Sequence, residues 1–278
     1  MKTIGFIGYG RMNQMLIQGF LSTRALTPTQ IVISTKTKEK VSALIDSYPD
    51  IRLMQDNRLL AALCDIIIIG VRPFDLLPVL QEIRDIKESN IHLVSLASCV
   101  RTQVITHAYP GRISRILPSI CSTVHDGISL CYHHSGVRPE EIAYIESLFC
   151  SVSTVMRVDE ELFEPAGDLM SCGPALITQM LVEMAAAGAR HSTISQEECL
   201  QMAVRTAQGT IRLLQEGVTP DELIRLVATP GGITEEGVNI LKKDLPSVFD
   251  RLFDTTLAKH TLVREHVSAQ WQKLNENQ

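Results

Sequence analysis

Two hydrophobic periods alternate along the first half of the chain. Six short runs are rich in isoleucine, valine and other strand-forming residues, and stretches of helical length separate most of them. The runs are Thr3–Ile7, Gln30–Ser34, Asp65–Val71, His92–Leu96, Ile113–Leu117 and Ile128–Tyr132, and the helical stretches are Met12–Thr23, Thr37–Ser47 and Phe74–Lys87. Strands that alternate with helices predict an α/β fold with a doubly wound, mostly parallel sheet. The four isoleucines of Ile66–Ile69 leave no polar face, so we expect that strand to be buried on both sides.

The pattern changes near residue 158. Val152–Val158 has the character of a last strand, and the remaining chain is helical in pattern, which divides the protein into residues 1–158 and an all-α domain at 159–278. In the second part, Ala175–Ala187 has only three polar members, namely Thr178, Gln179 and Glu183. A helix that is apolar nearly all round is buried on nearly all sides. We therefore expect the helical domains of two copies to pack together, as a homodimer or a higher homo-oligomer.

Composition narrows the classes of function. The chain has 278 residues, 45% of them apolar, and a formal net charge of −5, whereas a nucleic-acid-binding domain is usually basic. The seven cysteines form no C-x-x-C pair and the eight histidines show no metal-ligand spacing, so we expect reduced thiols, no metal and a cytoplasmic location. The apolar runs are too short for a transmembrane helix, and early glycines interrupt any signal peptide. Neither a nucleic acid nor a membrane is expected as a partner.

The first strand runs into a glycine turn and then into a helical pattern. The turn spans Gly8–Met12 (GYGRM), in which Gly8 allows a tight turn and Gly10 lets backbone approach a pyrophosphate. The following helix start offers unpaired N–H groups and a positive dipole. Two glycines are a weak signal, and an ordinary strand–turn–helix is the alternative. In this context, residues 1–158 are predicted to be a Rossmann-type dinucleotide-binding domain. Asn13 takes the place of the fingerprint's third glycine, which predicts looser packing or a shifted helix.

The end of the second strand decides between two nicotinamide cofactors. A site for NADH carries an acid about 20 residues after the turn, which accepts hydrogen bonds from the ribose hydroxyls. Here Ser34, Thr35 and Lys36 follow, with Lys38 close behind, and no carboxylate occurs before Glu39. Hydroxyl and ammonium groups suit a 2′-phosphate, so NADP(H) is expected rather than NAD(H). An exposed basic helix start is the alternative.

Four further segments carry a resemblance to a known family. They are Asp65–Pro73 (DIIIIGVRP), Arg115–Ser119 (RILPS), Ser171–Ala175 (SCGPA) and Val227–Thr234 (VATPGGIT). The chain resembles the pyrroline-5-carboxylate reductase family over essentially its whole length, and the last segment is the most specific. The resemblance implies hydride transfer from NADPH to the C=N carbon of Δ1-pyrroline-5-carboxylate, which gives L-proline. Because hydride transfer needs position and electrostatics more than acid–base groups, the lack of an evident catalytic dyad is compatible with it.

Expected cofactor residues come from the two strand ends and from the resemblance. The strand ends contribute Gly8, Tyr9, Gly10, Arg11, Met12, Ser34, Thr35 and Lys36. The resemblance implies that Asn57 lies near the adenosine, that Val71, Arg72 and Pro73 lie along the cofactor, and that Ala97 and Ser98 close the nicotinamide side. Two of these residues have simpler interpretations: Asn57 as a helix N-cap, and Arg72 as a solvated charge at a strand end.

The expected substrate is a small imine or amino acid that carries a carboxylate. The turn Thr229–Gly232 favours a positive φ at glycine followed by a helix start, where backbone N–H groups can hold that carboxylate. The resemblance implies substrate contacts at Ser119, Cys172, Gly173, Pro174, Thr229, Gly231, Gly232 and Ile233. It places Thr234 near the imine nitrogen as the catalytic residue. The alternative is that Thr234 is only a helix N-cap.

Several residues depart from the family's pattern. Besides Asn13 they are Ser119, Cys172, Leu176 and Thr219, which stand where the family has asparagine, serine, tyrosine and histidine. Because a polar site discriminates through its hydrogen bonds, these changes would alter what the pocket binds. Some of the variants resemble the late-competence ComER-type relatives, with their S-C-G-P-A and G-G-x-T-x-E-G elements.

Two alternatives to a pyrroline-5-carboxylate reductase stay open. One is a reductase-like competence or regulatory protein of the same fold, with altered or lost substrate specificity. The other is an NADP-linked β-hydroxyacid dehydrogenase, which shares the layout of the two domains. That enzyme would need a lysine on the long interdomain helix as its acid, and no lysine occurs between Lys87 and Lys242.

Overall fold

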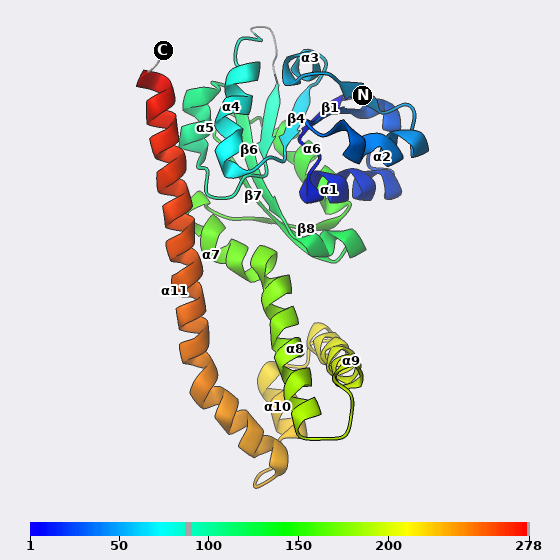
Figure 1. The fold of residues 1–278 in the computed structure, drawn as a ribbon, viewed down its shortest axis with the longest axis vertical. Coiled ribbons are helices and arrows are strands. Elements are labelled where there is room, and N and C mark those ends of the chain that lie inside the picture. Colours follow the sequence, from blue (N-terminus) through cyan, green and yellow to red (C-terminus); the bar gives the residue numbers. More distant parts are fainter. Residues whose placement is uncertain (87–90, 277–278) are drawn as a thin grey trace. The chain divides into compact units, whose positions relative to one another are not determined.

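The structure is a computed structural model that describes residues 1–86 and 91–276. It divides into two units, of which the first holds an eight-stranded sheet with helices and the second is helical (Figure 1). The first unit comprises Met1–Ser171 and Leu257–Gln278, and the second comprises Cys172–Thr256.

The sheet grows outward in both directions from its first strand. The strands are β1 (Ile4–Ile7), β2 (Ile31–Ser34), β3 (Arg52–Met54), β4 (Ile66–Ile69), β5 (His92–Ser95), β6 (Arg112–Pro118), β7 (Gly127–His133) and β8 (Ser153–Arg157), in the order β3-β2-β1-β4-β5-β6-β7-β8. Strands β1 to β6 are parallel, β7 runs antiparallel to β6, and β8 is parallel to β7. The predicted α/β class with a doubly wound, mostly parallel sheet is confirmed. The short strand β3 was not predicted, because its three residues carry no strong alternation.

Helices cover both faces of this sheet. They are α1 (Arg11–Ser22), α2 (Ser42–Ser47), α3 (Asn57–Ala61), α4 (Pro73–Ile83), α5 (Thr102–Ala108), α6 (Pro139–Cys150) and α7 (Phe163–Gly167). The helix expected over Phe74–Lys87 corresponds to α4, and Lys87 itself lies outside the described residues. In β4, Ile66 and Ile68 pack in a cluster with α1 and α6, while Ile67 and Ile69 pack with α3, α4 and α5. All four side chains are at most 1% exposed, which confirms a strand buried on both faces.

The second unit contains long helices. They are α8 (Gly173–Arg190), α9 (Gln196–Gln215), α10 (Pro220–Val227) and the first part of α11 (Ile233–Glu276). The boundary of the first unit lies later than residue 158, and the last part of α11 returns to that unit. Phe163 and Met170 account for the later boundary, because they pack against Leu130 of the sheet. Val267 accounts for the return, because it is buried in the cluster shared by α4 and α5.

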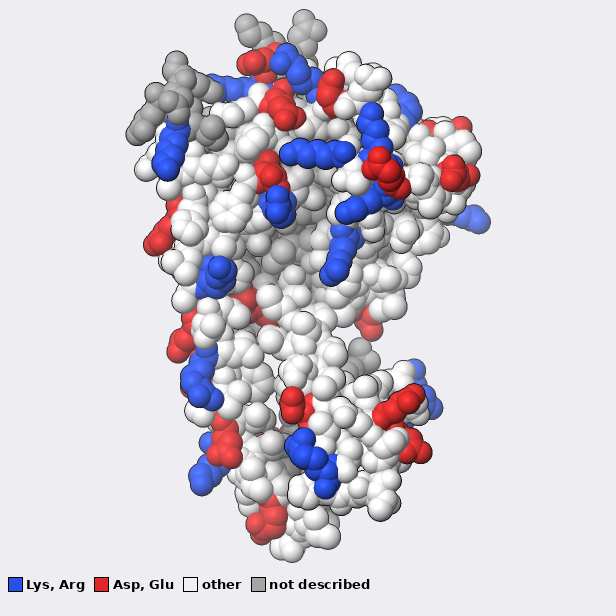
Figure 2. Space-filling view, in the orientation of Figure 1, with Lys and Arg blue, Asp and Glu red and all other residues white. Residues whose placement is uncertain are grey.

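Helix α8 exposes much of its apolar surface. Ile177, Met180 and Met184 are 54%, 48% and 64% exposed in the single chain. The segment Glu160–Arg190 is long and apolar enough to cross a membrane by length and composition, and only 17% of its apolar window is buried. The segment is not one straight helix, because α7, a π-helical turn and α8 follow one another in it. Broad uncharged areas lie between separate charged groups on the helical unit (Figure 2). These apolar side chains of α8 are not covered within the helical unit.

Candidate active site

The glycine turn after β1 is tightly fixed. Gly8 has φ +85°, and its N–H donates to the Ser34 carbonyl of β2 at 2.8 Å. A Cβ at Gly8 would lie 3.0 Å from both the Gly70 carbonyl oxygen and a Val71 methyl group. Gly10 differs, because a Cβ there would meet only the Gly70 oxygen, at 3.8 Å. The fold itself requires glycine at position 8, whereas Gly10 leaves open space in front of the turn.

The N-terminus of α1 is free to bind an anion. Gly10 precedes the helix without a side-chain cap, and no acidic residue occurs in the first turn. The first intrahelical bond runs from the Gln14 N–H to the Gly10 carbonyl at 2.9 Å, so the preceding N–H groups of Arg11 and Met12 have no helical acceptor. Tyr9 is buried in the turn and Arg11 is exposed. Uncapped N–H groups and the positive end of the helix dipole favour a phosphate at this position.

Asn13 closes the contact that the expected third glycine would make. Its side chain is fully buried, and its Nδ2 donates to the Gly8 carbonyl at 2.7 Å and to the Ile7 carbonyl at 3.2 Å. A Cβ on Gly70 would lie 2.6 Å from the Asn13 amide. The expectation of looser packing is therefore wrong, because the missing Cβ of Gly70 makes room for the larger side chain.

The end of β2 holds a small polar network. The Ser34 hydroxyl donates to Asn57 Oδ1 at 2.8 Å, and the Asn57 amide donates to the Glu82 carboxylate of α4. The simpler interpretation of Asn57 as a helix cap is wrong. Asp56 caps α3, since its carboxylate accepts the Leu59 N–H at 2.8 Å. Asn57 is instead held beside Ser34.

The lysines that follow β2 are exposed. Thr35 is half-buried, and both Lys36 and Lys38 extend into solvent. Within residues 1–86 and 91–276, neither lysine forms an ion pair. Their ammonium groups are therefore available to a phosphate.

The remaining expected cofactor residues lie at the same edge of the sheet. Strands β1, β4 and β5 are parallel neighbours, so the residues after them, Gly8, Val71 and Ala97, share the carboxyl edge. Ala97 is buried, and its N–H faces the Ser95 hydroxyl at 3.3 Å. Ser98 and Pro73 follow at the ends of the same two strands.

Arg72 fits its simpler interpretation. Its side chain is 84% exposed, and its Nε donates to Asp75 at 2.9 Å across the first turn of α4. The guanidinium is a solvated ion-pair partner at a strand end.

The predicted anion-binding turn before α11 has the expected backbone. Gly231 has φ +71°, and the Gly232 N–H donates to the Thr229 carbonyl at 2.8 Å. The Gly231 N–H is taken by the chain itself, because it donates to the Glu235 carboxylate at 2.7 Å. Thr234 is exposed and lies inside α11, which begins at Ile233, so the N-cap interpretation of Thr234 is wrong. The turn already holds one carboxylate.

The other expected substrate residues fall in both units. Ser119 belongs to the sheet unit, where it is buried and its hydroxyl accepts the Cys121 N–H at 3.3 Å. The remaining ones, Cys172, Gly173, Pro174, Thr229, Gly231, Gly232, Ile233 and Thr234, belong to the helical unit. Thr219, one of the departures, is the N-cap of α10, with its hydroxyl accepting the Glu222 N–H at 3.3 Å.

Comparison with known proteins places the chain. Residues 160–262 match the family model described as pyrroline-5-carboxylate reductase dimerisation, and residues 3–98 match NADP oxidoreductase coenzyme F420-dependent. Pyrroline-5-carboxylate reductase 3 of Bacillus subtilis (strain 168) is 31% identical over 272 residues, which cover 97% of this chain and 100% of the relative. The chain belongs to the pyrroline-5-carboxylate reductase family. ComE operon protein 4 of the same bacterium is 28% identical over 96% of this chain and 97% of its own length.

Solved structures of this reductase family share the fold. The Plasmodium falciparum pyrroline carboxylate reductase with NADP bound has a TM-score of 0.84 at 20% identity, covering 95% of this chain and 98% of its own. The Coxiella burnetii pyrroline-5-carboxylate reductase has a TM-score of 0.81 at 25% identity, covering 96% and 98%. The Rossmann-like domain followed by a helical dimerisation domain is thus confirmed for this member of the family.

A buried ion pair connects parts of the sheet unit, and its arginine, Arg115, is the first residue of the segment Arg115–Ser119. Arg115 of β6 is 1% exposed, and its NH1 donates to Glu160 at 2.8 Å. The same carboxylate accepts the Thr102 N–H at 2.6 Å and the Thr102 hydroxyl at 2.9 Å, and Arg115 also lies over the Phe163 ring at 4.5 Å. The pair ties α5, β6 and the segment after β8 together. In the sequence, the arginine within an otherwise mostly apolar strand could have indicated this buried ion pair.

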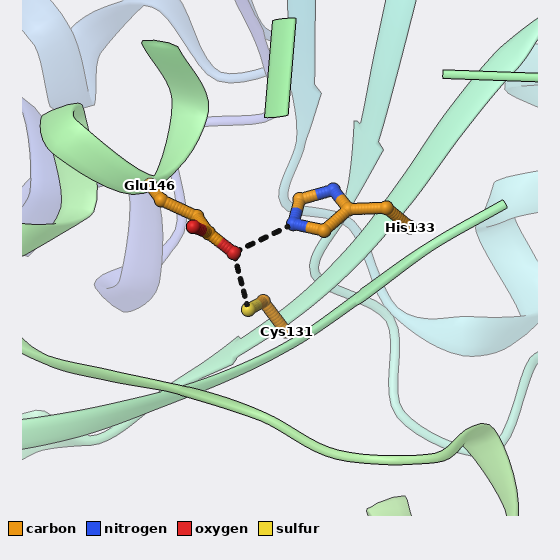
Figure 3. Close-up of side chains that lie close together, drawn as sticks. All are labelled: Cys131, His133 and Glu146. Carbon is orange, nitrogen blue, oxygen red and sulfur yellow. Dashed lines mark hydrogen bonds and ion pairs between the residues drawn. The ribbon is translucent and has the colours of Figure 1, made fainter. Parts of the chain in front are cut away.

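A second polar cluster, away from the glycine turn, has the residue types of a metal site. Cys131 and His133 lie on β7, and the Glu146 carboxylate of α6 points toward both, at 3.5 Å from the sulfur and 3.2 Å from the ring nitrogen (Figure 3). Arg157 occupies both Glu146 oxygens, at 2.5 and 2.7 Å, and holds the pKa of that carboxyl below its usual range. Burial raises the pKa of the Cys131 thiol to about 12. The charge of Glu146 is thus already neutralised by Arg157. The absence of a metal stays a prediction.

Proposed function

We propose that the protein reduces a small cyclic imine with NADPH, most simply Δ1-pyrroline-5-carboxylate to L-proline. The observation that carries the proposal is the glycine turn: an uncapped helix start with open space at Gly10, in a chain that matches a reductase of this family from end to end. NADPH supplies the hydride in this reaction. The protein's residues supply position, charge and exclusion of water.

The described residues fit NADPH. Gly8, Gly10 and the N–H groups of Arg11 and Met12 would hold the pyrophosphate, because no side chain or acid occupies that position. Ser34, Thr35 and Lys36 would hold the 2′-phosphate, and Asn57, fixed by Ser34, would face the adenosine. Tyr9, Val71, Arg72, Pro73, Ala97 and Ser98 complete the proposed cofactor site along the carboxyl edge of the sheet. We infer NADP(H) rather than NAD(H) because no carboxylate occupies the end of β2.

The helical unit supplies the proposed substrate end. We place the substrate carboxylate at the turn Thr229–Gly232, where it would displace the Glu235 carboxylate from the Gly231 N–H, and we assign the Thr234 hydroxyl a hydrogen bond to the imine nitrogen. In this role Thr234 would hold the imine nitrogen, and it needs no proton transfer of its own when the iminium form binds. Ser119, Cys172, Gly173, Pro174 and Ile233 are the further substrate contacts that we propose.

The deciding experiment is a cofactor assay with a matched variant. Purified protein with NADPH and Δ1-pyrroline-5-carboxylate should oxidise the cofactor and form proline, detected by mass spectrometry. Thr234→Ala should lower turnover more than it lowers stability, while Thr255→Ala, farther along the same helix, should lower neither. NADPH binding without any turnover would refute the reductase assignment and leave the cofactor site standing.

A second candidate function rests on the turn before α11. The Gly231 N–H, which a substrate carboxylate would use, already binds the Glu235 carboxylate at 2.7 Å. This favours either a substrate without a carboxylate at that position or a regulatory protein that keeps NADPH and has lost turnover. Calorimetry separates the two, since a regulatory protein would bind NADPH but neither proline nor a neutral cyclic imine.

The exposed face of α8 leads us to propose a homodimer built on the helical unit. The family's dimerisation model matches residues 160–262, which also supports a functional division close to residue 158, between a cofactor domain at 1–158 and a substrate and dimerisation domain at 159–278. A second copy would cover Ile177, Met180 and Met184. We further propose a cytoplasmic location, with no nucleic acid and no membrane as partner. None of the seven cysteines, all of which lie in the described part of the chain, forms a disulfide, which suits a reducing compartment.

A further inference from the structure

Cys99 stands in an unusual backbone conformation at the carboxyl edge of the sheet. It follows Ala97 and Ser98 at the end of β5, and its φ is +62°. The left-handed region is strained for a residue with a side chain, and such strain gathers at functional positions. In this conformation the Cys99 thiol faces His260 in the last part of α11, which belongs to the same unit.

The thiol belongs to a three-residue relay. Cys99 Sγ lies 3.0 Å from His260 Nδ1, and His260 Nε2 lies 2.9 Å from Asp168 Oδ1. Asp168 is fully buried, in a π-helical turn over Asp168–Cys172, a local irregularity that is frequent at functional sites. An ionised carboxylate only accepts, so Nε2 carries the ring proton and the lone pair of Nδ1 faces the thiol. Asp168 thus fixes the tautomer in which His260 can take the Cys99 proton.

A cavity adjoins Cys99. It has a volume of about 360 Å³ and is lined by Cys99, Arg101, Arg264, Val267 and Ser268, among others. Cys99 is only 4% exposed, so the reagent that reaches it must be small. The Nε of Arg101 is buried and has no hydrogen-bond partner among the described residues. Two arginines line this cavity, one of them Arg264, which also pairs with Glu164 at 3.5 Å, and their positive charge suits a reagent that develops negative charge as it reacts.

The surroundings of Cys99 keep its thiol protonated, so a nucleophilic reaction there needs a base. Burial raises the pKa of the Cys99 thiol, as does the nearby Glu164, whereas Ser98, Arg115 and Arg264 lower it without reversing the shift. The resting group is therefore a protonated thiol that must lose its proton during attack. His260 is the neighbouring acceptor, and Asp168 stabilises the imidazolium that results.

We propose that Cys99 is a nucleophilic thiol that small hydroperoxides modify, with His260 as its base and Asp168 as the positioning residue. The sulfur attacks the terminal peroxide oxygen, an S–O bond forms and the O–O bond breaks. Sulfur is oxidised to the sulfenic acid, and the peroxide is reduced. The thiol proton passes through His260 Nδ1 to the departing oxyanion, which leaves as water or an alcohol beside Arg101 and Arg264. The proposal does not depend on the reductase activity.

The test is site-resolved trapping of sulfenic acid. The full-length protein is treated with hydrogen peroxide and a dimedone probe, and each cysteine peptide is quantified by mass spectrometry. Cys99 should be labelled about tenfold or more faster than Cys131, which is equally buried and faces the Glu146 carboxylate. Asp168→Asn, which keeps the shape but reverses the hydrogen bond to His260, should slow Cys99 about tenfold, while the exposed Cys150 keeps its rate.

Two further readouts keep the test decisive. Buried Cys64 reports loosening of the fold, and a variant that exposes it is replaced by His260→Gln. In the wild type, the pH profile of Cys99 alkylation by iodoacetamide should differ from that of Cys150, because Cys99 reacts through His260. The proposal fails if Cys99 reacts no faster than Cys131, if both variants leave its rate unchanged, or if its pH profile matches that of Cys150.

Discussion

At the residue scale, the glycine turn shows how a side chain can be exchanged without loss of a site. Asn13 stands where the dinucleotide fingerprint has glycine, yet its amide holds the carbonyls of Ile7 and Gly8. The space for this larger side chain comes from Gly70 on the other side of the contact, because glycine has no Cβ. The requirement for close approach therefore belongs to the pair of positions and not to one of them, which a search for a single motif does not detect.

The charge after β2 leads to a prediction on cofactor choice. Lys36→Asp should shift preference from NADPH toward NADH by about tenfold or more, because the carboxylate repels a 2′-phosphate and accepts ribose hydroxyls instead. The measurement is the ratio of the two dissociation constants by fluorescence titration. Lys40→Asp makes the same change of charge on the same exposed segment and should leave the ratio close to the wild-type value. Equal shifts in both variants would mean that the overall charge of the segment, and not a contact of Lys36 with the 2′-phosphate, sets the preference.

The turn before α11 leads to a prediction on substrate affinity. Glu235→Ala removes the carboxylate that occupies the Gly231 N–H, so KM for an imine carboxylate should fall several-fold. Glu236→Ala is the matched control, because both acids lie in the first turn of α11 and contribute similarly to the helix dipole, by about 0.5 kcal/mol. If KM is the same in both variants, the turn is not the carboxylate site.

At the scale of elements, the features that could be predicted from the sequence are those that depend on a short run of neighbouring residues. The isoleucine run of β4 and the glycine turn before α1 are local, and both were predicted correctly. The network of Cys131, His133 and Glu146 was missed because it needs alternate positions on β7 and a residue from α6, which only the tertiary fold brings together. The helix start at Ile233 was placed one residue too late, since cap residues alone fix a boundary loosely.

Strands β5, β6 and β7 share a buried polar chain that makes stability depend on pH. His92 Nε2 lies 2.7 Å from the Ser114 hydroxyl, which lies 2.6 Å from His133 Nδ1. Burial lowers the pKa of His92 to about 4 and also lowers the pKa of His133. Between about pH 6.5 and pH 4 the unfolded chain binds more protons than the fold. The stability that neutral His92 contributes is therefore present above about pH 6.5 and is lost as the pH falls toward 4.

The expected size of this effect is about 3 kcal/mol in the free energy of unfolding for His92. Urea denaturation at a series of pH values measures it. His92→Gln keeps a group that can bond Ser114 but does not titrate, so its curve should be flatter over the same window. A slope equal to that of the wild type would assign the acid sensitivity to other groups.

At the scale of the whole molecule, the sheet unit buries a large core, whereas the helical unit leaves much of its apolar surface exposed. The sheet is covered on both faces, and its second cluster even includes Val267 from the end of α11. By contrast, α8 exposes Ile177, Met180 and Met184. Exposed apolar area of this kind is typical of an interaction site. A second copy is the simplest cover, because each chain brings the same face.

This leads to the last prediction. Met184→Lys should shift the proposed dimer toward monomer in light scattering, because it would bury an unpaired charge at the proposed interface, at a cost of several kcal/mol. Leu59→Lys is the control, since Leu59 is 48% exposed on the sheet unit and should leave the mass unchanged. The segment Glu160–Arg190 is also apolar enough for a membrane, so sedimentation with lipid vesicles is measured in parallel. A monomeric wild type that sediments with vesicles would replace the dimer by a membrane surface, whereas a dimer that stays in solution assigns the face of α8 to the second copy.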